Sequence, residues 1–150
     1  MHGLGEGVTD AQAYIEDHHR RLMGIIACPY VDVVVHPWCG GHSYARRGRI
    51  EGKSWRFEWI PERYLVEFLD AAAQSGKAVE INAKVLADAG DPAFQHYLAL
   101  LRESGIPIAV GSDAHDIERV GNVDPLNALL EAAGFGTERL WRPNVTRAHS

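Results

Sequence analysis

Side chains that can bind metal ions follow directly after two apolar runs of the sequence. His36 comes after the β-branched run at 31–35, and Asp113 and His115 come after the run at 106–110. Imidazole nitrogen combined with carboxylate oxygen suits Zn, Mn or Fe better than Ca or Mg, which prefer oxygen alone. A bound cation of this kind lowers the pKa of its water from ~15.7 toward about 7, which makes hydroxide available at neutral pH. These three residues therefore predict a metal site with hydrolytic chemistry.

A basic segment between 42 and 53 supplies groups that can neutralise a phosphate. Guanidinium matches phosphate oxygens with two parallel hydrogen bonds, so Arg46 and Arg49 are candidate substrate contacts, with His42 at the rim of the site. Asn82, at the end of a predicted strand, is a further candidate for that rim. The alternative interpretation of the segment is a solvated loop on a chain that is acidic overall.

The hydrophobic periodicity of the first sixty residues predicts one helix, one strand and one loop. Thr9 and Gln12 fit a capping box at the start of the helix, which Pro29 ends. The β-branched run at 31–35 is typical of a strand. The segment 38–60 has no clear period, so we expect an elaborated loop there.

The rest of the chain alternates between helices and strands. Asp91-Pro92 and Asp124-Pro125 each supply a cap and a first-turn proline for a helix, and a third helix opens at Pro61. Glycine stops each of these three helices, at positions 76, 105 and 134. Strands are predicted at 78–82, 106–110 and, as a short final one, 139–142. Inside the first of them Glu80 is expected to be buried with a partner.

This alternation is the pattern of an α/β fold with a parallel sheet covered by helices. Ligands bind such sheets at the carboxyl ends of the strands. His36, Asn82, Asp113 and His115 all follow strand ends, so we expect them to meet at one edge of the sheet.

Length and composition exclude several classes of protein. The chain has 150 residues, of which 46% are apolar and 23% charged, so it is neither disordered nor fibrous. The net charge of −5 argues against a broad nucleic-acid surface. No run is long enough for a membrane helix, no signal peptide is visible, and the two cysteines form no disulfide pattern. We expect a cytoplasmic protein of one domain without a membrane partner.

Three motifs resemble the last motifs of the PHP superfamily, which is named for polymerase and histidinol phosphatase domains. They are Asp-Val-Val-Val-His-Pro at 32–37, Val-Glu-Ile-Asn at 79–82 and Gly-Ser-Asp-Ala-His at 111–115, and the resemblance covers roughly residues 30–142. It implies a distorted seven-stranded β/α barrel with a site for divalent metal ions (Zn, Mn or Fe) and phosphoesterase activity. Carried over by motif, His36, Asp113 and His115 are metal ligands, and His2 lies at about the spacing of a further ligand.

The chain also departs from the family pattern. The family begins with a His-x-His pair, a further histidine and a metal-bridging glutamate, and neither these nor the early strands that carry them are found here. The chain therefore resembles the C-terminal half of such a barrel, with ligands for one or two metal ions. A half-barrel leaves an edge strand and an apolar interior exposed, so we expect a homodimer.

Three functions are compatible with these residues. The first is a metal-dependent phosphoesterase that hydrolyses a small phosphate monoester, similar to histidinol phosphatase, or the C-terminal fragment of one. The second is a non-catalytic PHP remnant that binds metal or supports an assembly. The third is an amidohydrolase-like metal hydrolase, whose usual carboxylated lysine has no obvious counterpart here, although Lys84 follows a strand end. Metal content, compared between this chain and a version extended upstream, distinguishes the first two.

Overall fold

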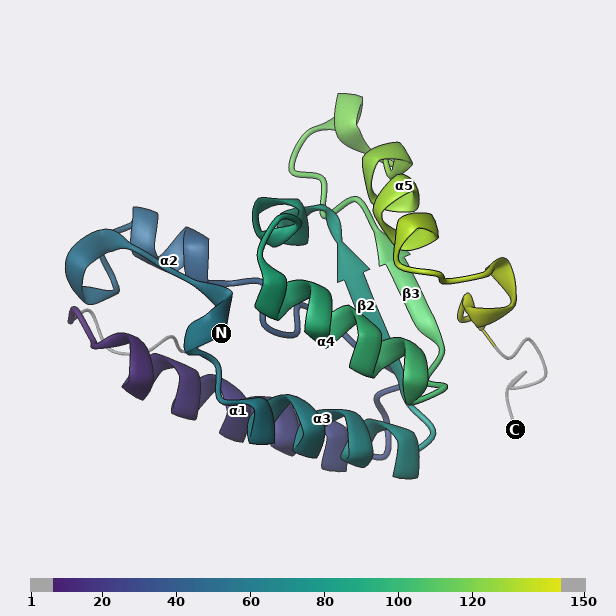
Figure 1. Cartoon of the computed structure of the whole chain (residues 1–150), viewed down its shortest axis with the longest axis horizontal. Helices are drawn as coiled ribbons and strands as arrows, with labels where there is room; N and C mark the ends of the chain where they lie inside the picture. The colour runs from purple at the N-terminus through teal and green to yellow at the C-terminus, as the bar shows by residue number, and fades with distance from the viewer. Residues whose placement is uncertain (1–6, 144–150) are drawn as a thin grey trace.

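The computed structural model describes residues 7–143 (Figure 1). Helices and parallel strands alternate along the chain, as the periodicity predicts. The α-helices are α1 (Ala11–Ala27), α2 (Gly41–Arg46), α3 (Glu62–Gln74), α4 (Pro92–Glu103) and α5 (Asp124–Ala132), and the strands are β1 (Val33–Val34), β2 (Ala78–Asn82) and β3 (Ile108–Gly111). Short 3-10 turns connect them: η1 (Glu51–Lys53), η2 (Phe57–Trp59), η3 (Ala83–Asp88), η4 (Ile117–Arg119) and η5 (Thr137–Arg139).

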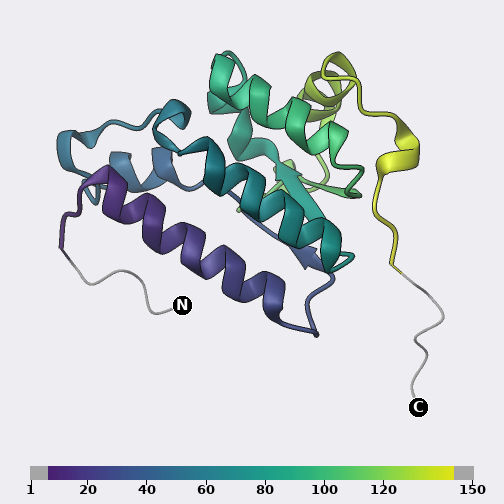
Figure 2. The ribbon, with the colours of Figure 1, turned by 60° about the horizontal axis from the view of Figure 1, so that its bottom comes forward.

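The strands form one small parallel sheet in the order β1-β2-β3. Val34, Val79 and Ile108 stand side by side in this register, and all three are buried. Helices α1, α3 and α4 lie on the same side of the sheet (Figures 1 and 2). The α/β class and the parallel sheet are confirmed. Within residues 7–143 the sheet is open, and the seven-stranded barrel stays a prediction.

Side chains alternate between the two faces of a strand, so Glu80 and Asn82 point away from the face that carries Val79 and Ile81. Val79 and Ile81 belong to the apolar core that the helices cover. The opposite face is only partly covered, because Val35 beside it is 50% exposed. The sheet therefore has one apolar, packed face and one that carries polar side chains.

The first strand is shorter than the predicted run at 31–35. Lys77, itself buried, donates from Nζ to the carbonyl oxygens of Cys28 (2.9 Å) and Val31 (2.6 Å). The carbonyl of Val31 is therefore bound by an ammonium group rather than by a neighbouring strand. The predicted final strand at 139–142 is reduced to a single bridge between Leu140 and Ile108.

The segment 38–60 is an ordered part of the core rather than a plain loop. It contains α2, η1 and η2, and its aromatic residues Trp38, Trp55 and Phe57 are buried. The Trp55 ring packs edge-on against Tyr14, with centroids 5.5 Å apart. The segment is ordered because its aromatic side chains, which have no regular spacing, are buried against distant helices.

Helix ends follow the predicted signals except at the starts of α1 and α5. At α5 the predicted cap Asp124 is the first helical residue, and Val123 takes the cap position without a side-chain hydrogen bond. Asp91 caps α4 by accepting from the backbone N–H of Ala93 at 2.8 Å, as predicted. The predicted capping box at Thr9 and Gln12 is wrong, because Asp10 caps α1 and accepts from Ala13 N at 3.0 Å. The backbone of Thr9 instead forms a parallel bridge with Ile50. No helix among residues 7–143 is long and apolar enough to cross a membrane.

The cap assignment gives a direct stability test. Asp10→Ala removes the side-chain acceptor at the start of α1 and should lower the free energy of unfolding by about 1 kcal/mol. Thr9→Ala should have a smaller effect, because Thr9 contributes backbone atoms to its bridge. Urea unfolding of the two variants measures this, and a larger loss for Thr9→Ala would contradict the assignment.

Candidate active site at the carboxyl ends of the strands

Polar side chains from all three strand ends meet at one edge of the sheet. His36 follows β1, Asn82 ends β2, and Asp113 follows β3. His36 Nδ1 lies 2.9 Å from Asn82 Nδ2, and His36 Nε2 lies 3.8 Å from Asp113 Oδ1. Parallel pairing places the carboxyl ends of neighbouring strands together, which accounts for this convergence.

Glu80 is a central member of this cluster. Its Oε2 accepts hydrogen bonds from the backbone N–H of His36 and from Asn82 Nδ2, both at 2.9 Å, and lies 3.5 Å from His36 Nδ1. Gly111 gives the carboxylate room, because a Cβ there would stand 2.7 Å from Glu80 Oε1. The sequence predicted a buried partner for Glu80 but no role in the site. The two-residue spacing from Asn82, which puts both side chains on one face, was the signal for that role.

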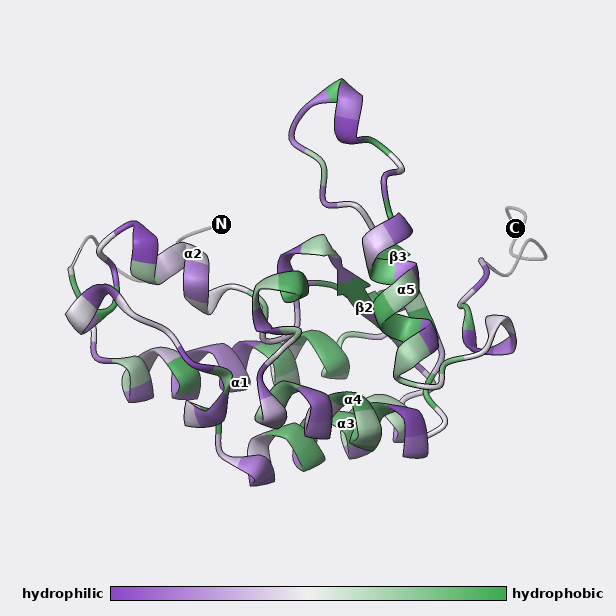
Figure 3. Cartoon of the chain, turned by 45° about the horizontal axis from the view of Figure 1, so that its top comes forward, coloured by the Kyte–Doolittle hydropathy of each residue, from purple (hydrophilic) through white to green (hydrophobic). Residues whose placement is uncertain are grey.

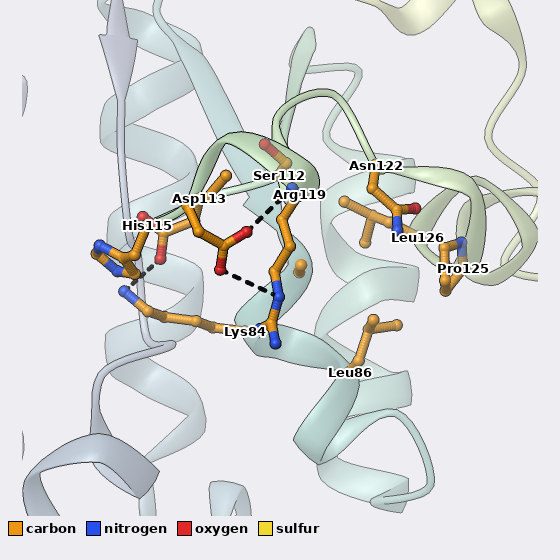
Figure 4. A pocket seen from close by; sticks show the side chains of 12 residues that line it. Lys84, Leu86, Ser112, Asp113, His115, Arg119, Asn122, Pro125 and Leu126 are labelled. Atoms are coloured by element: carbon orange, nitrogen blue, oxygen red, sulfur yellow. Dashed lines mark hydrogen bonds and ion pairs between the residues drawn. The ribbon is translucent and has the colours of Figure 1, made fainter.

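Lys84 supplies the counter-charge for Asp113. Its Nζ forms an ion pair with Asp113 Oδ2, which Figure 4 shows with His115 beside it. The backbone N–H of Lys84 donates to Asn82 Oδ1 at 3.0 Å, so the lysine is tied to the end of β2. Burial raises the pKa of Asp113, but the hydrogen bond and charge of Lys84, together with His36 and His115, lower it more. The net pKa is below its ordinary value, so Asp113 is a carboxylate at neutral pH.

The backbone turns sharply after β1 and β3. His36, Trp38 and Asp113 have φ values of 56°, 60° and 47°, in the left-handed region that residues other than glycine rarely adopt. Such conformations cost about 1–3 kcal/mol each and persist only where the surrounding structure holds them. Two of these three residues are the predicted ligands His36 and Asp113.

Helix α1 holds the turn after β1 through a buried histidine. His18 Nε2 accepts a hydrogen bond from the backbone N–H of Trp38 at 3.2 Å, and the two rings pack edge to face. Burial lowers the pKa of His18 to about 4, so the ring is neutral and available as an acceptor at neutral pH. Helical spacing placed His18 in α1, and nothing in the sequence indicated this contact.

Two cavities adjoin the cluster, and Lys84 lines both. The larger has a volume of about 450 Å³, and its lining includes Asp113 and His115 (Figure 4). The loop with η4 forms part of its wall and extends away from the rest of the chain in Figure 3. The smaller, of about 160 Å³, is lined by Cys39, His42, Ser43, Arg46, Lys84 and Ala87.

The predicted substrate contacts occupy different places. His42 Nε2 lies 2.7 Å from Asp88 Oδ1, a buried carboxyl whose pKa burial raises, and this contact holds His42 at the smaller cavity beside Arg46. Arg49 lines neither cavity, and its carbonyl oxygen accepts from the Thr9 backbone N–H. Asn82 is 1% exposed, so it lies beneath the rim and orients its neighbours.

The imidazole of His36 and the carboxylate of Asp113 are ligand types that suit a single divalent cation. Zinc lies about 2.0–2.2 Å from nitrogen or oxygen ligands, so two ligands of one ion are at most about 4.4 Å apart. His36 Nε2 and Asp113 Oδ1, at 3.8 Å, meet that limit. Across residues 7–143, however, no three His, Cys, Asp or Glu side chains are already grouped to hold an ion. His2 lies outside the described residues.

Comparison with known proteins found distant relatives. The chain is 29% identical over 136 residues to a protein of Caldanaerobacter subterraneus subsp. tengcongensis, and 22% identical over 135 residues to a protein of Acetivibrio thermocellus. Both relatives are named probable phosphatases. The alignments cover 89% of this chain but only 46% and 48% of the relatives, so the chain spans about half their length. No family model and no solved structure matches.

The burial of His18, which lowers its pKa, makes stability depend on pH. The folded pKa is about 4 against an ordinary 6.5, so the unfolded state binds more protons between these values, and stability falls as pH is lowered through that window. From pH 7 to pH 5 this contribution should fall by about 2 kcal/mol. His18→Gln, which cannot titrate, should lose correspondingly less in urea unfolding. An equal loss in both proteins would contradict this role.

Proposed function

We propose that this protein is a metal-dependent phosphoesterase that hydrolyses small phosphate monoesters. The observation that carries the proposal is the meeting of His36 and Asp113 at the strand ends, beside a cavity that Asp113 shares with His115. Two sequence similarities support it. The motifs around these residues resemble those of the PHP superfamily, and both curated relatives are named probable phosphatases.

In this proposal His36, Asp113 and His115 hold a divalent cation, which is Zn, Mn or Fe. The cation, when bound, supplies a water of lowered pKa and neutralises phosphate charge. The chain itself orients the ligands. Asn82 Nδ2, 2.9 Å from His36 Nδ1, and Glu80 Oε2, which accepts from the same amide and from the His36 backbone N–H, fix the position of the imidazole, as outer partners of metal-binding histidines commonly do.

The larger cavity suits the organic part of the substrate. Its volume of about 450 Å³ lies within the usual range for small-molecule sites, roughly 300–1,000 Å³. Its lining combines apolar Leu86, Pro125 and Leu126 with polar Ser112 and Asn122. Arg46, in the smaller cavity, is the proposed phosphate contact.

We further propose that the partly open face of the sheet is covered by polypeptide in the active protein. Val35 on this face is half exposed, and the relatives are about twice as long as the matched region. A homodimer is the proposed form for this chain, and light scattering that shows a monodisperse monomer would contradict it.

One observation favours the alternative of a non-catalytic role. Lys84 already neutralises the charge of Asp113. A structural protein without a metal ion would need such a counter-charge. Metal analysis by mass spectrometry that finds no metal would favour a purely structural role, whereas a remnant that binds metal differs from the phosphoesterase in releasing no phosphate.

Asp113→Asn tests the proposed activity. Asparagine keeps the size of the side chain and tolerates a positive φ, but it removes the charged ligand. With Mn²⁺ and a panel of small monoesters, phosphate release should fall more than about 100-fold, since changes to outer-shell partners alone typically cost 10–100-fold. Asp70→Asn, on the exposed side of α3, is the matched control and should keep the wild-type rate. Wild-type protein that binds Mn²⁺ but releases no phosphate would support the non-catalytic alternative.

A further inference from the structure

Lys84 is placed where it can oppose a cation at Asp113. Its ammonium contacts Asp113 Oδ2, an atom that is buried and makes no other hydrogen bond. The Asp113 side chain is 15% exposed, so little water replaces that partner. The lysine thus stands in for the positive charge that a metal ion would bring to this carboxylate.

A divalent cation and the ammonium cannot both contact Asp113 at low cost. Like charges about 4 Å apart repel strongly in a partly buried site, where the effective dielectric constant is well below that of water. His36 and His115 lie beside the same carboxylate and add no negative charge. Cation binding at His36 and Asp113 therefore requires Lys84 to leave.

The structure offers Lys84 a second position. Its backbone is held by Asn82, but its four-carbon side chain also lines the smaller cavity, where Arg46 and His42 lie. The two cationic side chains, Lys84 and Arg46, would repel each other at one small cavity that holds only water. A phosphate group there would accept hydrogen bonds from Lys84 and Arg46 and remove that repulsion.

We propose that Lys84 couples the two binding events: it pairs with Asp113 in the metal-free protein, and a bound cation displaces it into the smaller cavity to bind phosphate. This inference rests on the proposed metal site. It assigns to Lys84 opposite effects on the two ligands, because the same ammonium hinders the cation and helps the anion. A lysine with a purely structural role would change neither affinity.

Lys84→Met tests the coupling, because methionine keeps an unbranched side chain and removes the charge. Mn²⁺ should bind the variant about tenfold more tightly in calorimetry, and inorganic phosphate should bind the Mn²⁺-loaded variant about tenfold more weakly. Tenfold is the effect typical of one charge-assisted hydrogen bond. Lys84→Arg keeps the charge and should retain both wild-type affinities. Arg20→Met is the matched control, since Arg20 is an exposed cation paired with Asp17 on α1.

The outcomes separate this inference from the proposed function. If Asp113→Asn loses Mn²⁺ binding and Lys84→Met binds Mn²⁺ like wild type, the metal site stands and the role of Lys84 is wrong. Tighter Mn²⁺ binding with unchanged phosphate binding also overturns the coupling. If neither wild type nor Lys84→Met binds Mn²⁺, the proposed metal site fails and the inference fails with it. Circular dichroism and thermal melts of each variant confirm that the chain is folded.

Discussion

The pairing of β2 with a parallel neighbour on each side is the constraint on which the candidate site depends. It aligns the carboxyl ends of three strands, so residues from 36, 82 and 113 reach the same few ångströms although they are far apart in sequence. The apolar face of the same sheet secures this alignment. Val34, Val79 and Ile108 are buried in register under the helices, and a shift of one residue would turn them outward.

Charge balance decides what the cluster can do. Two carboxylates, Glu80 and Asp113, lie close to the imidazole of His36, and each has a different partner. Glu80 is satisfied by hydrogen bonds within the sheet, from a backbone N–H and an amide. Asp113 is neutralised by the flexible side chain of Lys84. Another cation can replace that side chain more easily than it can replace the backbone and amide donors of Glu80. The site therefore combines a fixed carboxylate that orients and a second carboxylate whose counter-ion can change.

The turns that carry these side chains are held from outside the sheet. The left-handed conformations at His36 and Trp38 follow a strand of only two residues, so the strand itself cannot impose them. A hydrogen bond from Trp38 to His18 and the burial of the Trp38 ring against α1 stabilise this turn. The helices thus contribute to the site as well as to the core.

The sequence by itself determined the α/β class, the parallel sheet and the strand ends that carry His36, Asn82 and Asp113, because periodicity and caps are local properties. It also placed most helix boundaries, although the caps predicted at Thr9 and Asp124 each lie one residue away from the residue in the cap position. Only the tertiary structure decided the roles of Glu80, Lys84 and His18. Each of these acts through a partner on another element or across a turn, and spacing along the chain does not encode such contacts. For the same reason, the sequence did not predict that the segment 38–60 is ordered, since its aromatic residues pack on helices that are distant in sequence.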